Sequence, residues 1–328
     1  MLRLAAFATL CLAAAVQPAS AQKKLSFQLD FIATGVHAPY YYAREQGWYE
    51  KAGIDLSIEV GKGSAFAAQT VGSGAAQMGE ADFATALVAI SKGADIKAVM
   101  NIYGQSPQTF YWLKGHGIES YKDFPGHSIG NPPGDAGRAM FPGFARSAGI
   151  DPQTIRFVNL APAAKVAALR SGTVDIITDF YNGHDLKVKE FGDKLGFLRW
   201  RELGIDPYGK SVIVNTAFLK ANPETVKAFV AVTQKAFAFC MKTIDPCLDA
   251  LMAKVTGLDR NVQKDEWGRL KELAATPESK TMSLGWFNGD RIASDYQIVD
   301  KYIGFEKQFD PKTTYTNEFL DKSITLPN

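Results

Sequence analysis

The stretch ATGVHAPYYYAREQGWYE, residues 33–50, follows a short alternating apolar segment, LSFQLD at 25–30, and directs the interpretation of the whole chain. It holds a lone histidine and three consecutive tyrosines, whose hydroxyl groups need hydrogen-bond partners wherever they are buried. Because adjacent residues of a helix face in different directions, we expect one tyrosine, Tyr40, to face a cavity together with His37. A purely structural, hydrogen-bonded role for the isolated His37 is the alternative interpretation.

Segments typical of strands and of helices alternate along the first two thirds of the chain. The strands are expected at 25–30, 54–60, 76–82 and 96–103, and in a second series at 109–115, 127–131, 156–160, 174–180 and 196–200. A return strand leads into a mainly helical C-terminal region. This order predicts an α/β fold of two lobes, each a mostly parallel sheet flanked by helices. We expect lobe 1 to comprise residues 22–110 and 212–328, and lobe 2 to comprise residues 111–211.

The N-terminal 21 residues have the pattern of an export signal. Arg3 precedes the apolar segment 4–16, and Ala19-Ser20-Ala21 follows the small-x-small cleavage rule. The apolar segment is too short to span a bilayer. We therefore expect cleavage after Ala21 and a mature protein in the periplasm.

Charge and motif content exclude several function classes. The 36 Lys and Arg against 34 Asp and Glu give a net charge of +2, so we expect no nucleic-acid partner. No Gly-x-Ser-x-Gly motif occurs, and we expect no enzyme, no metal and no cofactor. The four histidines lack the spacing of metal ligands: they are His37, His116, His127 and His184.

Two cysteines, Cys240 and Cys247, remain after cleavage of the signal. In an oxidising compartment their spacing is compatible with a disulfide, since the intervening residues contain a helix end where the chain can turn back. Spacing alone does not determine geometry, so two buried thiols are an equally good interpretation.

Ligand-binding residues are expected where the strands end, because open α/β sheets bind ligands beyond the carboxyl ends of their strands. Several of these loops lead into helix N-termini, whose free N–H groups bind anions or polarised oxygens. For the aspartates, helix capping is a competing interpretation. The candidate ligand-binding residues are Asp30, Phe31, His37, Tyr40, Gly63, Ser64, Ala65, Asp82, Gly134, Asp135, Asp179, Tyr181 and Asn182.

Several short motifs together resemble one known family. They are HAPYYYA (37–43), QGWY (46–49), GIDL (53–56), GSG (72–74) with MG (78–79), and NPETV (222–226). The chain resembles the periplasmic solute-binding proteins of ABC importers for thiamine-pyrimidine precursors, nitrate, taurine and alkanesulfonates. Within that family, HAP (37–39) and YTNEFL (315–320) resemble the pyrimidine-precursor branch, which includes fungal synthase enzymes.

This resemblance implies a type II periplasmic binding protein, a monomer that closes about a hinge on a small molecule and docks on an ABC permease in the inner membrane. We expect an amine-bearing heteroaromatic ligand. Phe31, Tyr40, Phe180 and Tyr181 would stack on its ring. Its amines would donate to Asp30, Asp82, Asp135 and Asp179.

Three other functions stay open at this point. An oxyanion such as a sulfonate would use Ser64, the amides of residues 63–65 and 134–136, and Arg138. A pyrimidine synthase would have a reactive His37, but the export signal argues against it. The segment GKSVIVN at 209–215 also lacks the cysteine-rich stretch of the synthase branch. A ligand sensor would bind by the same physics as a transporter component.

Overall fold

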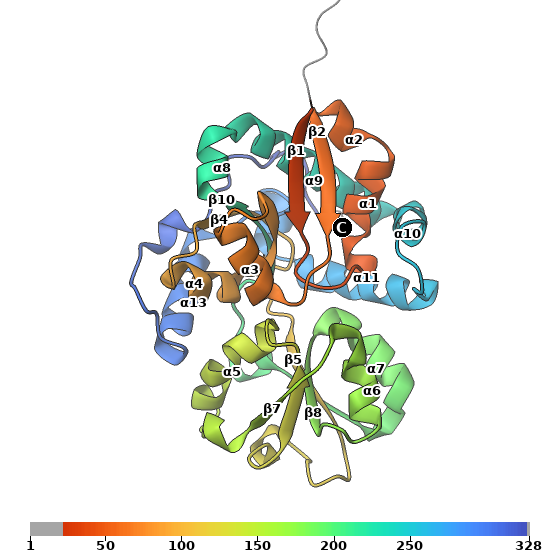
Figure 1. Ribbon diagram of the computed structural model, residues 1–328, viewed down its shortest axis with the longest axis vertical. Coiled ribbons are helices and arrows are strands. Elements are labelled where there is room, and N and C mark those ends of the chain that lie inside the picture. The colour runs from red at the N-terminus through yellow and green to blue at the C-terminus, as the bar shows by residue number, and fades with distance from the viewer. Residues whose placement is uncertain (1–21, 327–328) are drawn as a thin grey trace, which may run out of the picture.

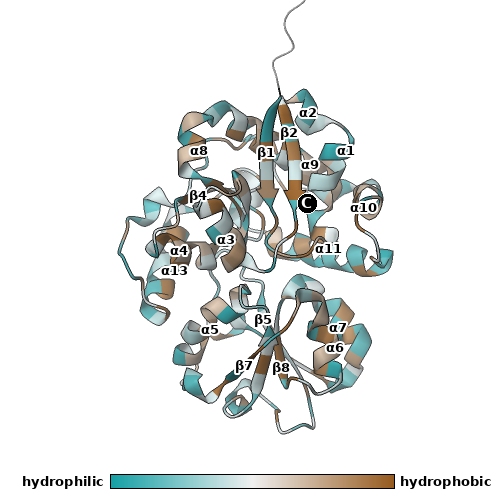
Figure 2. Ribbon diagram, viewed as in Figure 1, coloured by the Kyte–Doolittle hydropathy of each residue, from teal (hydrophilic) through white to brown (hydrophobic). Residues whose placement is uncertain are grey.

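The computed structural model describes residues 22–326, and the predicted signal peptide lies outside them. Two α/β lobes lie one above the other, and helix α11 (Arg260–Ala274) runs along the boundary between them (Figure 1). Figure 2 shows hydrophobic residues along the strands of both lobes. The predicted two-lobed α/β fold is therefore confirmed.

The first lobe contains a five-stranded sheet in the order β2-β1-β3-β10-β4. Strand β1 pairs in parallel with β2 and β3, whereas β10 runs antiparallel to both β3 and β4. The strands are β1 (Lys23–Gln28), β2 (Ile54–Glu59), β3 (Met78–Asp82), β4 (Ile96–Asn101) and β10 (Lys210–Asn215).

The second lobe repeats this arrangement with the order β7-β6-β8-β5-β9. Here β6 pairs in parallel with β7 and β8, and β5 is the antiparallel strand between β8 and β9. The strands are β5 (Gln108–Leu113), β6 (Ser128–Asn131), β7 (Arg156–Asn159), β8 (Ile176–Phe180) and β9 (Leu195–Arg199).

The antiparallel strand of each sheet is the one that has just crossed from the other lobe. Strands β5 and β10 each lie entirely in one sheet. The two segments that connect the lobes, which we call the crossings, are therefore residues 102–107 and 200–209. Each lies a few residues before the lobe boundary expected from the sequence. The crossings are hydrogen-bonded to each other: Gly209 N–H donates to the carbonyl of Tyr103 at 2.9 Å. Ser106 N–H donates to the Asp206 carboxylate at 2.8 Å.

Helices cover both faces of each sheet, and the C-terminal helices return to the first lobe. The N-terminal and second-lobe helices are α1 (Ala38–Glu45), α2 (Trp48–Lys51), α3 (Ser64–Gly72), α4 (Phe83–Ser91), α5 (Ala136–Ser147), α6 (Lys165–Arg170) and α7 (His184–Phe191). The others are α8 (Thr216–Ala221), α9 (Pro223–Lys242), α10 (Asp245–Met252), α11, α12 (Pro277–Thr281) and α13 (Gly289–Tyr302). Helices α1 and α2 are separate because Gly47 between them adopts a φ of 65°, which a glycine tolerates without strain.

Cys240 and Cys247 form a disulfide, with their Cα atoms 6.2 Å apart. The bond joins the end of α9 to the start of α10, and both residues are fully buried. This decides between the two interpretations that the sequence left open. Within the described residues, no helix has both the length and the apolar character needed to cross a bilayer.

Helix α13 carries a buried carboxyl that contacts the second crossing. Asp295 is 2% exposed, and it accepts a hydrogen bond from Tyr208 N–H at 2.9 Å. Burial raises the pKa of Asp295 to about 7, although the Tyr208 hydrogen bond and Arg291 oppose the increase. The unfolded chain ionises near the ordinary value of 3.8, so folding becomes less favourable as the pH rises from about 4 to about 7.

The Asp295→Asn variant has no carboxyl group to ionise, so it lacks this pH-dependent loss of stability. Its amide oxygen can still accept the hydrogen bond from Tyr208 N–H. The free energy of unfolding of the variant, relative to wild type, should rise by roughly 2 to 4 kcal/mol between pH 4.5 and pH 8. Urea denaturation at both pH values measures the difference. The matched control is Asp290→Asn, an exposed position of the same helix, which should show no such change. If the free energies of unfolding of Asp295→Asn and wild type differ by the same amount at both pH values, the prediction is contradicted.

Candidate functional site

A cavity of about 180 Å³ lies between the two lobes. It lies at the carboxyl edges of the parallel strands, where sequence reasoning placed the ligand. From the first lobe it is lined by residues that include Asp30, Phe31, Thr34, His37, Gly63, Ser64, Lys210 and Glu266. From the second lobe the lining includes Asp135, Pro162, Lys165, Asp179, Phe180, Asn182, Leu186 and Lys187.

The backbones of the two lobes meet beside this cavity. Gly63 has a φ of 134°, and a Cβ atom there would collide with the carbonyl of Gly134 in the other lobe. Ala65 N–H at the start of α3 donates to that same carbonyl at 3.1 Å. A glycine is therefore needed at position 63, both for its backbone angle and for the close approach of the lobes.

On the first-lobe side, a buried cluster surrounds the amine of Lys210. Its Nζ lies 2.8 Å from Asp30 Oδ1 and 3.0 Å from Glu80 Oε2, and 2.9 Å from Nε2 of His37. Lys210 is the first residue of β10, and in the antiparallel register it lies opposite Asp82, the last residue of β3. The return strand thus delivers an ammonium to the edge where the parallel strands deliver carboxylates.

His37 connects the strand-end turn to this cluster. Its Nδ1 accepts the Thr34 N–H at 3.0 Å, and its Nε2 contacts the Lys210 ammonium at 2.9 Å. That nitrogen faces the carboxylates of Asp30 and Glu80, each at 3.4 Å. Asp30, His37 and Glu80 are grouped closely enough to hold a metal ion, but the Lys210 ammonium contacts all three and supplies the positive charge there.

The pKa values of this cluster follow from burial opposed by its opposite charges. Burial alone would raise the pKa of Asp30, but Lys210 and His37 outweigh it and lower that pKa to about 2. The pKa of Glu80 is lowered for the same reason. Burial would lower the pKa of Lys210, yet Asp30 and Glu80 raise it above its usual range. All three groups are therefore ionised at neutral pH.

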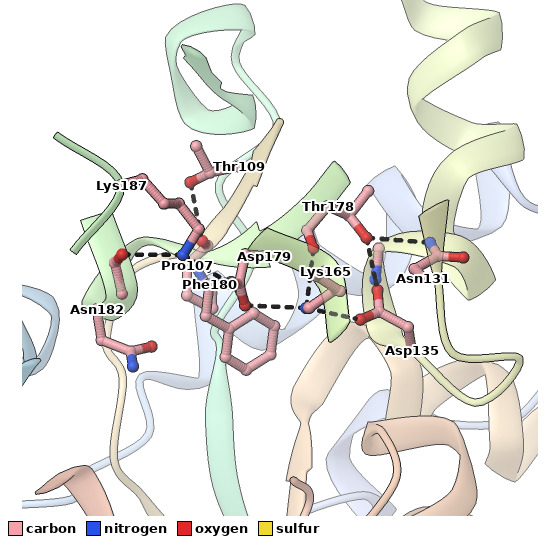
Figure 3. Close-up of polar contacts among 12 residues, drawn as sticks. Pro107, Thr109, Asn131, Asp135, Lys165, Thr178, Asp179, Phe180, Asn182 and Lys187 are labelled. Carbon is pink, nitrogen blue, oxygen red and sulfur yellow. Dashed lines mark hydrogen bonds and ion pairs between the residues drawn. The ribbon is translucent and has the colours of Figure 1, made fainter. Parts of the chain in front are cut away.

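On the second-lobe side, two lysines hold two aspartates (Figure 3). Lys165 Nζ lies 3.1 Å from Asp179 and 3.5 Å from Asp135, and it donates to the Thr178 carbonyl at 2.9 Å. Lys187 Nζ lies 2.7 Å from the other oxygen of Asp179 and donates to the Gly183 carbonyl at 2.9 Å. Both ammonium groups are buried, and each contacts a carboxylate and a backbone carbonyl of the second lobe.

The second-lobe aspartates differ in their pKa values. Burial would raise the pKa of Asp179, but Lys165 and Lys187 lower it well below its ordinary value. Burial raises the pKa of Asp135, and Lys165 and Thr178 only partly oppose this. Asp135 also caps α5, because its Oδ1 accepts from Gly137 N–H at 2.9 Å. Its capping role, one of the two sequence interpretations, is present in the structure.

Eight of the thirteen residues expected at the ligand line this cavity. They are Asp30, Phe31, His37, Gly63, Ser64, Asp135, Asp179 and Asn182. Phe180, also expected to stack on a ring, lines the cavity from the second lobe. Lys165 Nζ lies 4.7 Å from the Phe31 ring centroid, so this contact joins the lobes across the cavity.

Five of the expected residues do not line the cavity. Tyr40 is fully buried in the first-lobe core, with its ring 4.7 Å from Phe27 and 5.4 Å from Phe237. Asp82 caps α4, accepting from Thr85 N–H at 3.1 Å. The remaining three, Ala65, Gly134 and Tyr181, lie in contacts between the lobes.

These corrections have physical reasons. His37 ends the turn that precedes α1, whereas Tyr40 lies within α1, whose inner face packs on the first-lobe core. Burial raises the pKa of Asp82 to about 6, and the hydrogen bonds from Thr85 only partly oppose this increase. Tyr181 is held between Arg199 and Arg269, whose guanidinium carbons lie 3.7 and 5.2 Å from its ring centroid.

Sequence reasoning missed the lysines and one glutamate: Lys165, Lys187, Lys210 and Glu266. The two second-lobe lysines lie in helices after strands, where no motif marks them. The position of Lys210, in contrast, could have been predicted from the sequence. A charged residue that opens a return strand is placed by an antiparallel register at the edge where the parallel strands end.

Outside the cavity, a set of polar contacts connects the lobes, and we call it the α11 clasp. Arg269 of α11 makes two bonds of 2.7 Å to the Asp185 carboxylate of α7, and it donates to the Tyr181 hydroxyl at 3.3 Å. Glu272 of α11 pairs with Arg199 of β9 at 2.9 Å. The buried Trp267 anchors α11 to the first lobe beside Phe237.

Relatives with assigned functions include both enzymes and a binding protein. The chain is 22% identical over 307 residues to a Legionella pneumophila protein named 4-amino-5-hydroxymethyl-2-methylpyrimidine phosphate synthase, covering 92% of this chain and 93% of that protein. It is 21% identical over 234 residues to the formylaminopyrimidine-binding protein of Halalkalibacterium halodurans, covering 71% of each chain.

Solved structures of binding proteins share the fold. The alkanesulfonate-binding protein SsuA from Xanthomonas axonopodis pv. citri superimposes with a TM-score of 0.69 at 15% identity, covering 91% of this chain and 99% of that one. The periplasmic nitrate-binding protein NrtA of Synechocystis gives a TM-score of 0.57 at 14% identity, covering 76% of this chain and 70% of that one. At this identity the likeness concerns the fold.

One sequence-based expectation is overturned by these comparisons. We expected no enzyme, yet relatives that are 22% to 24% identical are named as pyrimidine phosphate synthases, from a bacterium and from fungi. The absence of a catalytic motif was a weak argument, because a reactive group in a cavity needs no such local signature.

The family itself follows from a match that covers most of the chain. The family described as NMT1/THI5 like matches residues 34–245. That span begins at the strand-end loop of His37, includes the whole second lobe, and ends within the helices that return to the first lobe. This protein therefore belongs to the NMT1/THI5-like family.

Proposed function

We propose that this chain is the solute-binding component of an ABC importer and that it captures a small amine-bearing heteroaromatic solute of the pyrimidine-precursor type. In this proposal the signal peptide directs it to the periplasm, where the monomer closes on the solute and docks on a membrane permease. A cavity between two lobes, lined by an aromatic ring from each, is the structural support for this function.

The charged groups that line the cavity support this choice of solute class. Four carboxyl groups and three lysines line the cavity, and each lysine already contacts a carboxylate. Among the described residues, the lining thus offers no uncommitted ammonium or guanidinium to an anion. A neutral or cationic ring with amino groups suits such a lining better than an oxyanion does.

Three of the groups expected to bind an oxyanion are committed elsewhere. Gly63 N–H donates to the Asp30 carbonyl at 2.6 Å, and Ala65 N–H donates across the lobes to Gly134. Arg138 is outside the lining, and it donates to Asn159 at 2.6 Å. A sulfonate or nitrate would have to displace these bonds, each worth about 1 kcal/mol.

Capture by hinge closure is part of the proposal, and it rests on contacts between the lobes. The two hydrogen-bonded crossings form the hinge, and the α11 clasp lies beside it, because Gln105 N–H of the first crossing donates to the Leu273 carbonyl of α11 at 3.2 Å. The contacts that join the lobes favour the closed form, and a solute touching both lobes favours it further.

Arg269→Ala should weaken solute binding about threefold to tenfold, because the bidentate bond to Asp185 is lost from the closed form alone. Isothermal titration measures the affinity, and small-angle scattering of the ligand-free protein should give a larger radius of gyration. The matched control is Arg260→Ala in the same helix, whose bonds to Asp245 and Asp249 stay within the first lobe. Equal affinities for Arg269→Ala and wild type would contradict hinge closure through the clasp.

A ligand panel tests the proposed solute class. By isothermal titration, purified mature protein should bind 4-amino-5-hydroxymethyl-2-methylpyrimidine at least tenfold more tightly than taurine, ethanesulfonate or nitrate. A preference for any of these anions would refute the proposed class. Consumption of the pyrimidine, or its release as a product from other substrates, would instead identify an enzyme.

A further inference from the structure

Three of the four carboxyl groups that line the cavity are already paired. Asp30 lies 2.8 Å from Lys210, Asp179 lies 2.7 Å from Lys187, and Asp135 lies 3.5 Å from Lys165. A solute that took over one of these carboxylates would leave a buried lysine without its counter-charge, which is strongly unfavourable. These three groups therefore serve to hold the lysines.

Glu266 is the fourth carboxyl, and its surroundings are different. It lies on α11, is 8% exposed and lines the cavity. Its Oε2 accepts a hydrogen bond from the side-chain amide of Asn182, a neutral donor, at 3.3 Å. Within residues 22–326, no lysine, arginine or histidine forms an ion pair with it, although such pairs surround the other three.

The pKa of Glu266 reflects the free-energy cost of burying an unpaired carboxyl group. Burial raises the pKa of Glu266, and a hydrogen bond from Thr34 together with the more distant Lys187 only partly offsets the increase. A buried acid without a cation gains more from a solute that donates N–H groups than a paired acid does, since the solute supplies the missing partner.

Amino-substituted heteroaromatic rings match a carboxyl group at two points. The amino group donates to one carboxyl oxygen, and the adjacent ring nitrogen shares a proton with the other oxygen. Such bidentate, charge-assisted pairs are stronger and more directional than single neutral hydrogen bonds. They require a carboxyl whose oxygens are not held by an ammonium group.

We propose that Glu266 is the specificity-determining residue of the cavity, which selects an amino-substituted ring by this two-point pairing. The inference rests on the proposed function, and it replaces the earlier expectation that Asp30, Asp82, Asp135 and Asp179 receive the amines. The Asn182 contact gives Glu266 a second role. Since Asn182 belongs to the other lobe, a solute held by Glu266 lies where both lobes can contact it.

A matched pair of ligands and a matched pair of variants test this role. The ligands are 4-amino-2-methylpyrimidine and 2-methylpyrimidine, which differ by the amino group alone. The variants are Glu266→Met, which has a similar length but no hydrogen-bonding carboxyl, and the control Asp265→Asn, an exposed neighbour in the same helix. Isothermal titration of the full mature chain gives the affinities, and thermal unfolding of each variant verifies that it is folded.

Glu266→Met should bind 4-amino-2-methylpyrimidine about 10-fold to 100-fold more weakly than wild type, the usual range for loss of a charged hydrogen-bond partner. Its affinity for 2-methylpyrimidine should stay within about twofold of wild type. Asp265→Asn should match wild type for both compounds.

The outcomes separate this inference from the proposed function. If wild type prefers the amino compound but Glu266→Met binds it equally well, or loses both compounds by the same factor, the role of Glu266 is refuted and the solute class stands. If wild type binds neither compound and binds ethanesulfonate instead, the solute class is refuted, and the role of Glu266 falls with it.

Discussion

Pairing of buried lysines with strand-end carboxylates is the constraint on which the site depends. Lys210, Lys165 and Lys187 are almost completely buried, and an uncompensated ammonium at such depth would strongly destabilise the fold. Asp30, Glu80 and Asp179 compensate them at 2.7 to 3.1 Å. The strongest electrostatic interactions of the cavity are thus internal, and they define which groups remain for a solute.

The topology explains why these pairs form at the cavity. In each sheet, one antiparallel strand enters from the other lobe. The first residues of that strand therefore lie at the same sheet edge as the last residues of the parallel strands. The same two crossings form the hinge. Charge pairing, lobe connection and cavity position therefore have a common origin in the exchange of β5 and β10 between the lobes.

Much of this architecture was predictable from the sequence. Period-two apolar segments predicted the strands to within a few residues. The residues proposed from the strand-end rule include Asp30, His37, Ser64, Asp135 and Asp179, which line the cavity. Tyr40 was misplaced because its direction depends on the exact turn that enters α1. Glu266 was missed because α11 follows the last strand by some 45 residues in the chain, and only tertiary packing brings it to the cavity.

The central claim is that the cavity between the lobes retains an amine-bearing aromatic solute. Native mass spectrometry of the protein released gently from a bacterial periplasm tests this most directly, because a closed two-lobed protein keeps its solute during purification. We expect a one-to-one complex whose added mass is that of a small nitrogen heterocycle. An added mass equal to that of a sulfonate or of nitrate would contradict this expectation.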